Sequence, residues 1–195
     1  MAFPILRLTI FPLVRFLFIK NITGLETLPK KGRYIIASNH ASYADAPLLF
    51  ATIVSVINRP IHFVSWKRVQ YWPLIGKIAP YFGAIFENGS MDKLLEKLKR
   101  GCVVGIYPEG GRTHTGKIQK VTHTGTGVLA AVGNAPVIPV KTAGTYELWP
   151  YNKTFPKITK TIEIRIGKPI RFTGKRTRKN YLSFGNKVMN IIERL

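Results

Sequence analysis

Residues 34–57 read YIIASNHASYADAPLLFATIVSVI, and a strand pattern, a polar loop and a helix pattern follow one another in this stretch. The run 34–37 is apolar, which is typical of a short buried strand. Polar side chains then dominate residues 38–45, and Pro47 stands in the first turn of an apolar body that predicts a helix over residues 44–57. A strand that leads through a polar loop into a helix is typical of α/β proteins.

The same alternation continues along the rest of the chain. The expected further strands are residues 61–66, 82–86, 102–107 and 137–140, with a sheet-edge strand at 161–166; the expected helices are 69–79, 91–100 with Ser90 as N-cap, 125–132 and 181–195. This order predicts a single α/β domain with a mixed, mostly parallel sheet flanked by helices. Polar groups at the carboxyl ends of the strands would form its site.

Composition narrows the class of protein. With 195 residues, 46% of them hydrophobic and 20% charged, the chain can bury one sizeable core, so wholesale disorder is excluded. Its 30 lysines and arginines against 9 acidic residues favour a polyanionic partner, whether nucleic acid, an anionic membrane or a phosphorylated substrate. One cysteine and four histidines without the i, i+4 spacing of zinc proteases predict no metal site.

Residues 1–21 are strongly apolar, yet Arg7 and Arg15 interrupt the run and Pro4 and Pro12 break helical continuity. The segment therefore does not reach the about 20 apolar residues that a spanning helix needs. We expect an amphipathic helix in the membrane interface, with its arginines at the lipid phosphates. A helix packed on its own domain is the alternative. The absence of a signal cleavage site predicts a monotopic protein on the cytoplasmic face.

Two polar clusters follow predicted strands. In the first, His40 and Asp45 could meet across a tight turn, where the carboxylate would orient the imidazole as a general base. No Gly-x-Ser-x-Gly elbow supplies a nucleophile, so such a base would activate a hydroxyl on a bound substrate. In the second, Arg112 could bind a phosphate, and Glu109 could hold Arg112 or accept a hydrogen bond from a polyol. For His40 and Asp45 the alternative is a pair that caps a turn. For Glu109 and Arg112 the alternative is a plain salt bridge.

Together these clusters resemble the glycerolipid acyltransferase family that includes 1-acylglycerol-3-phosphate O-acyltransferases. The family signature Asn-His, four residues, Asp corresponds to Asn39, His40 and Asp45. The family block Phe/Tyr-Pro-Glu-Gly-Thr-Arg-Ser corresponds to residues 107–113, with Gly in place of Thr and Thr in place of Ser. The family strand Pro-Val-Ile-Pro-Val corresponds to residues 136–140.

The resemblance covers roughly residues 22–170, and we expect residues 22–195 to form an acyltransferase domain. It would transfer a fatty acyl group from acyl-CoA or acyl-carrier protein to the free hydroxyl of a lysophospholipid, most simply 1-acylglycerol-3-phosphate, giving phosphatidic acid. His40 and Asp45 would be catalytic, and no cofactor beyond the acyl donor is implied. The implied substrate-binding residues are Asn39, Glu109, Gly110 and Arg112.

One family block is incomplete. In Gly-x-x-Phe-x-x-Arg, the arginine that helps to bind the acceptor phosphate is replaced here by Gly89. Either another cation supplies the charge, with Lys67 as the best substitute, or the acceptor carries a different head group. Hydrolysis by the same base, which would make a thioesterase, is a further alternative because water and an alcohol need the same proton acceptor.

The C-terminal part of the chain is strongly basic. Residues 153–187 hold eleven lysines and arginines and only one acid, Glu163, which suits an anionic leaflet or the phosphates of coenzyme A. A basic nucleic-acid module would carry similar charge. The chain shows no nucleic-acid-binding signature, and its aromatic residues here are too sparse for stacking platforms, so we expect no nucleic-acid partner.

Overall fold

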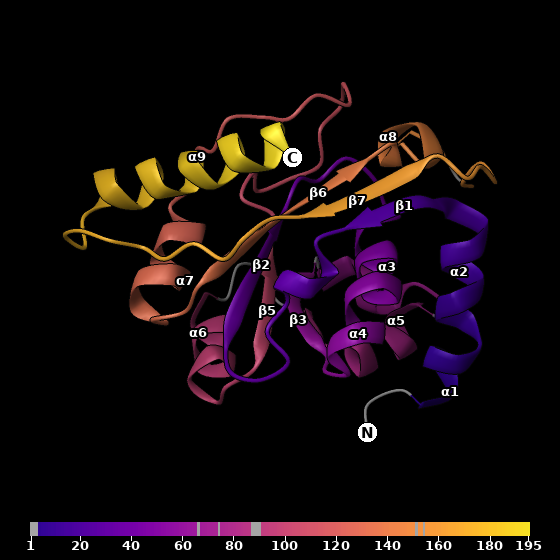
Figure 1. The fold of residues 1–195 in the computed structure, drawn as a ribbon, viewed down its shortest axis with the longest axis horizontal. Coiled ribbons are helices and arrows are strands. Elements are labelled where there is room, and N and C mark those ends of the chain that lie inside the picture. Colours follow the sequence, from indigo (N-terminus) through magenta and orange to yellow (C-terminus); the bar gives the residue numbers. More distant parts are fainter. Residues whose placement is uncertain (1–3, 66, 74, 87–90, 151, 154) are drawn as a thin grey trace.

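A seven-stranded sheet forms the middle layer of the described chain (Figure 1). The computed structural model describes residues 4–65, 67–73, 75–86, 91–150, 152–153 and 155–195. The strands are β1 Ile19–Thr23, β2 Tyr34–Ser38, β3 Ile61–Ser65, β4 Ala84–Phe86, β5 Val103–Ile106, β6 Val137–Ala143 and β7 Ile162–Ile166. They lie in the order β1-β7-β6-β2-β5-β3-β4. Since only the β6–β7 pairing is antiparallel, the predicted mixed, mostly parallel sheet is confirmed.

Helices cover both faces of the sheet (Figure 1). The short helical segments are α1 Pro4–Leu8, η1 Leu25–Thr27, η3 Lys67–Tyr71, α5 Ile75–Ile78, η4 Ala79–Phe82 and α8 Thr145–Leu148. The α2 helix (Ile10–Phe18) and the continuous run α3 Asp45–Leu49, η2 Phe50–Val54 and α4 Ser55–Ile57 pack on one face. The helices α6 Met91–Lys99, α7 Gly125–Val132 and α9 Arg178–Arg194 pack on the other. This sandwich buries both faces of the central strands, which explains their apolar runs.

Two sequence expectations about elements are wrong. The helix expected at 69–79 is broken into η3, α5 and η4, because Pro73 and Pro80 lack the backbone N–H that a continuous helix needs. The strand β7 is not a sheet edge, since it lies between β6 and β1. Strand β1 (Ile19–Thr23) pairs with the outer side of β7, and β1 begins within the segment expected to be helical. The N-cap expected at Ser90 lies outside the described residues.

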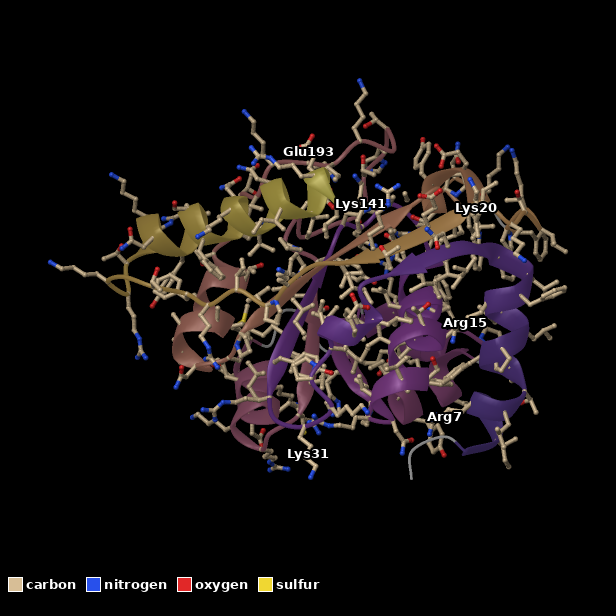
Figure 2. The ribbon with its side chains drawn as sticks, in the orientation of Figure 1. Arg7, Arg15, Lys20, Lys31, Lys141 and Glu193 are labelled. Carbon is tan, nitrogen blue, oxygen red and sulfur yellow. The ribbon has the colours of Figure 1, made fainter. Side chains whose placement is uncertain are left out.

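The N-terminal helices pack on the domain with one side and leave apolar side chains exposed on the other. Phe11 of α2 is buried in the core, so the helix packs on its own domain. Pro12 is tolerated because it stands in the first turn of α2. Arg7 donates to the Ser55 carbonyl at 2.8 Å, so its side chain turns toward α4 rather than outward (Figure 2). Ile5, Leu8, Leu13 and Phe16 nevertheless remain exposed. No helix in the described residues is long and apolar enough to cross a membrane.

Candidate active site

The two polar clusters leave the sheet at the same edge. The strands β2 and β5 are parallel neighbours, with Ala37 paired to Ile106, so the loops that follow them begin side by side. The backbone joins these loops directly, because the Thr113 N–H donates to the His40 carbonyl at 2.9 Å. The sheet thus brings together segments that are about seventy positions apart in the sequence, as expected for the carboxyl ends of parallel strands.

His40 and Asp45 form a hydrogen-bonded pair. The distance from His40 Nδ1 to Asp45 Oδ2 is 2.8 Å, and the side chain of His40 is 21% exposed whereas that of Asp45 is fully buried. Because a carboxylate only accepts, this contact places the ring proton on Nδ1 and leaves the lone pair on Nε2. The same Oδ2 accepts the backbone N–H groups of Ala41 at 2.7 Å and Ser42 at 2.8 Å. These bonds fix the carboxylate at the start of α3, so the dyad is preorganised.

A stacked aromatic ring holds the imidazole from the side. The rings of Tyr107 and His40 lie 3.8 Å apart at an angle of 10°, and Phe63 continues the stack at 5.5 Å from Tyr107. Burial, together with the negative charge of Asp45, raises the pKa of Tyr107 well above its ordinary value, so its hydroxyl stays protonated. That hydroxyl finds no hydrogen-bond partner among the described residues. The contribution of Tyr107 to the site is therefore its ring.

We expect Tyr107→Phe to keep full activity, because it retains the stack and removes a buried hydroxyl that is costly to leave unpaired. In contrast, Tyr107→Leu should lower kcat about 10- to 100-fold with little change in KM, because the imidazole loses the ring that holds its plane. Steady-state kinetics of both variants, with thermal unfolding, test this. The matched control is Tyr34→Leu, which also removes a buried tyrosine with an unpartnered hydroxyl, but at the opposite end of β2. An equal loss of kcat in that control would contradict the positioning role of Tyr107.

Asn39 joins the dyad loop to β6. Its side-chain amide donates to the Thr142 carbonyl at 2.9 Å, and its Oδ1 accepts the Thr142 N–H at 2.8 Å. Thr142 also places its hydroxyl 3.4 Å from Asp45 Oδ1. Asn39 is buried, and these contacts make it a support for the neighbouring His40. The sequence predicts a substrate-binding role for Asn39, and its described contacts are with the protein.

Glu109 is the second support of the dyad loop. Its carboxylate accepts the His40 N–H at 2.7 Å and the Gln119 N–H at 2.9 Å. Burial raises the pKa of Glu109, and the two backbone hydrogen bonds act in the opposite direction. Both oxygens are thereby engaged with backbone. This geometry differs from the sequence expectation, in which Glu109 holds Arg112 or a polyol hydroxyl.

Gly110 forms the turn between Glu109 and Arg112. It has a φ of +78°, at which a side chain would be strained, and an added Cβ would lie 2.7 Å from the ring of His123 and would have to displace it. Its N–H donates to the Tyr107 carbonyl at 3.0 Å. The tight turn returns the chain toward the dyad loop and presents Arg112 there.

Arg112 lies over an aromatic ring of the dyad loop. Its guanidinium carbon is 3.7 Å from the centroid of the Tyr43 ring, and its Nη1 is buried without a hydrogen-bond partner among the described residues. A buried guanidinium N–H without an acceptor is costly, and an anionic ligand would satisfy it. The aromatic rings of Trp72 and Trp149 pack against Tyr43 at 5.8 and 5.4 Å. Arg112 is therefore the anion-binding candidate of the site.

Lys67 begins η3 and is exposed. Within the described part of the chain, no hydrogen bond or ion pair joins it to the dyad or to Arg112, and its proposed role in place of the missing arginine stays a prediction. Gly89, where the family arginine is expected, lies outside the described residues. The described side chains also contain no group of three or more His, Cys, Asp or Glu placed to hold a metal ion.

Sequence reasoning missed the aromatic residues that surround the dyad. Tyr43 carries a signal that could have found it, because it stands inside the polar loop between His40 and Asp45. Trp149 carries none, since it comes from a distant segment. The backbone carbonyl of Trp149 accepts a hydrogen bond from the Ser42 hydroxyl at 2.7 Å, and this contact exists only in the folded chain.

Comparisons with known proteins identify relatives of this chain. The chain is 30% identical over 165 residues to the 1-acyl-sn-glycerol-3-phosphate acyltransferase of Pseudomonas aeruginosa, covering 80% of this chain and 60% of that protein. It is 38% identical over 84 residues, or 40% of this chain, to the lyso-ornithine lipid O-acyltransferase of the same organism, of which it covers 30%. The chain spans less than two thirds of the length of the curated relatives that it matches.

The fold has a counterpart among solved structures, and the family has a matching sequence profile. The 1-acyl-sn-glycerophosphate acyltransferase PlsC of Thermotoga maritima superposes with a TM-score of 0.78 at 23% identity, over 96% of this chain and 74% of that one. This match shows the fold. The profile of the family described as Acyltransferase covers residues 20–143, which is more than half of the 195-residue chain. The chain therefore belongs to the acyltransferase family.

Proposed function

We propose that this enzyme transfers a fatty acyl group from acyl-CoA or acyl-carrier protein to the free hydroxyl of a lysophospholipid, with 1-acylglycerol-3-phosphate as the first candidate acceptor. The observation that carries the proposal is the His40–Asp45 dyad, which shares one edge of the sheet with Arg112, whose buried Nη1 has no hydrogen-bond partner among the described residues. The first of these groups suits a hydroxyl and the second suits a phosphate on the same acceptor.

The chemical step follows from the dyad. His40 Nε2 removes the proton of the acceptor hydroxyl while its oxygen attacks the thioester carbonyl carbon. The buried carboxylate of Asp45 stabilises the imidazolium that forms. Collapse of the tetrahedral intermediate breaks the carbon–sulfur bond, and the thiolate takes the proton from the imidazolium as it leaves. The new oxygen ester remains on the acceptor, and no acyl-enzyme forms.

A second acceptor class has its own support. The arginine of the Gly-x-x-Phe-x-x-Arg block is absent, and one relative is a lyso-ornithine lipid O-acyltransferase. A lysolipid without a phosphate is thus the alternative acceptor. Hydrolysis of the thioester is the other alternative, and it differs only in that water replaces the alcohol.

Purified protein with long-chain acyl-CoA and a panel of lysolipids tests the proposal, with thiol release measured and products identified by mass spectrometry. Phosphatidic acid is the expected product. Arg112→Gln should raise KM for 1-acylglycerol-3-phosphate about 10- to 100-fold, since a charge-assisted hydrogen bond is lost, while KM for acyl-CoA stays unchanged. Arg171→Gln, at an exposed arginine between β7 and α9, is the matched control.

The same assay separates the alternatives. Free fatty acid as the main product would identify a thioesterase. Acylation of lyso-ornithine lipid alone would move the acceptor to the second class. No thiol release with any lysolipid, together with tight and salt-sensitive binding to nucleic acid, would favour a binding module and contradict an enzyme of this kind.

The proposed substrates are lipids, so the proposal includes a membrane surface. The exposed side chains of α1 and α2, namely Ile5, Leu8, Leu13 and Phe16, form an apolar outer face on a helix pair whose inner face packs on the domain. We assign this outer face to the interface of the cytoplasmic leaflet, where amphipathic helices of this kind bind.

A further inference from the structure

The chain between α8 and β7 carries a second exposed apolar cluster. Phe155 and Ile158 stand three positions apart and are each 80% exposed, which is a high exposure for two large apolar side chains so close in sequence. Three exposed lysines stand among them, at positions 153, 157 and 160. Phe155, Ile158 and these lysines are called the α8–β7 cluster below. Large apolar side chains interleaved with lysines are typical of segments that bind an anionic lipid surface.

The base of the cluster is anchored to the domain. The Lys157 N–H donates to the Leu148 carbonyl at 2.8 Å, and the indole N–H of Trp149 donates to the Lys153 carbonyl at 3.0 Å. These bonds connect the cluster to α8. The apolar side chains are thus held outward from a fixed base.

The cluster lies beside the apolar outer face of α2. The Lys160 ammonium is 5.0 Å from the centroid of the Phe16 ring, and Phe16 is itself 69% exposed. Figure 1 shows the chain that leaves α8 and the α2 helix at the same end of the molecule. Arg15 of α2 and Lys20 lie at this end as well (Figure 2). The two exposed surfaces therefore meet at Lys160 and Phe16.

This end of the molecule is also connected to the candidate active site. Trp149, at the start of the connection, packs on Tyr43, and Tyr43 carries the guanidinium of Arg112. Trp149 and Tyr43 therefore link the cluster to Arg112, the group that we assign to the acceptor phosphate. An interfacial lipid substrate needs such an arrangement, since its head group stays at the level of the lipid phosphates.

We propose that the α8–β7 cluster is a second membrane-docking element, which inserts Phe155 and Ile158 into an anionic leaflet beside α2 while Lys153, Lys157 and Lys160 contact the lipid phosphates. This inference deepens the proposed function and rests on it for the nature of the substrate. The occupant is a lipid surface because apolar insertion and positive charge act at the same place, and the charge on the cluster is all of one sign.

Flotation of the full chain with vesicles tests the inference. One set of vesicles is phosphatidylcholine mixed with phosphatidylglycerol, and the other is pure phosphatidylcholine. The double variant Phe155→Ser/Ile158→Ser should lower the partition coefficient at least about 10-fold on the mixed vesicles, because the apolar insertion is lost. Val132→Ser is the matched control, at an exposed apolar residue of α7 on the other face of the sheet.

A comparison of two variants that each lose three lysines separates docking of the α8–β7 cluster from general electrostatic attraction to the vesicles. The triple variant Lys153→Gln/Lys157→Gln/Lys160→Gln should lose about 10- to 100-fold in partition on the mixed vesicles and little on pure phosphatidylcholine. The matched variant Lys175→Gln/Lys179→Gln/Lys187→Gln removes the same charge from exposed lysines on and before α9 and should lose much less. Equal losses in the two triple variants, or unchanged partition of the double serine variant, would overturn the proposal.

The partition readout does not depend on turnover. If the wild-type chain binds vesicles as expected but acylates no lysolipid, the proposed function fails and the docking element stands. If the serine variant acylates a dispersed short-chain substrate at the wild-type rate but binds vesicles as tightly as wild type, the docking element fails and the proposed function stands.

Discussion

Replacing His40 with alanine is expected to lower acyl transfer by about 10²- to 10⁴-fold, which is the usual contribution of a positioned general base. The imidazole is the group with an open nitrogen at the dyad, and the Asp45 carboxylate behind it is fully buried and cannot take its place. The chain should still fold, because the His40 backbone bonds to Glu109 and Thr113 do not involve the ring. Vesicle binding should be unchanged, since the His40 side chain is only 21% exposed and is not among the side chains that we assign to the membrane surface.

Single-turnover kinetics with acyl-CoA and lysolipid, together with circular dichroism and vesicle flotation, provide the measurements. His114→Ala is the matched control, since His114 is an exposed histidine of the loop after the Arg112 turn. A His40→Ala variant that turns over at the wild-type rate would remove the imidazole from the mechanism. If the His40→Ala variant fails to fold, the same kinetics are measured on His40→Gln, which keeps a polar side chain of similar size.

Asp45→Asn should lower kcat by about 10²- to 10⁴-fold while the fold survives, because only the negative charge beside the imidazole is lost. The amide oxygen of asparagine can occupy the place of Oδ2 and accept from Ala41, Ser42 and the imidazole. Its NH₂ group can face the Thr142 hydroxyl, which is able to accept. The imidazolium that forms during the reaction then lacks its counter-charge.

Asp45→Ala is the companion variant, and a different outcome is expected. It leaves the N–H groups of Ala41 and Ser42 without their side-chain acceptor, which costs about 1–3 kcal/mol for each buried group. Urea unfolding should therefore show a large loss of stability for alanine and a small one for asparagine. If asparagine retained the wild-type kcat, the carboxylate would be a turn cap alone, which is the alternative that the sequence leaves open.

Much of the fold could be predicted from local patterns. The apolar run before Asn39 and the apolar body after Pro47 give β2 and the α3–α4 run, since burial on both faces of a sheet and in a helix core leaves a direct trace in the sequence. The apolar spacing of residues 69–79 predicts one helix, whereas Pro73 and Pro80 divide the segment between β3 and β4 into η3, α5 and η4. The strand β1 was missed because it is short, follows α2 directly and buries only Ile19, so no strand pattern marks it.

The candidate site could be predicted in part. The polar residues after β2 and β5 were found because parallel strands deliver their carboxyl ends to one edge. The supporting contacts could not be found in this way. Asn39 with Thr142, and Glu109 with the His40 backbone, are pairings across the sheet edge, and in each the partner of the side chain is a main-chain group that leaves no residue-specific trace.

By itself, the sequence determined the α/β class, the two polar loops and the identity of the ionisable groups, because hydrophobic periodicity and residue chemistry are local properties. Only the tertiary structure decided how those groups are used. It stacked Tyr107 on His40, turned Glu109 toward backbone amides, placed Arg112 over Tyr43 and set Lys160 beside Phe16. The physical reason is that such contacts depend on the register of the strands and the packing of the loops, which the folding of the whole chain fixes together.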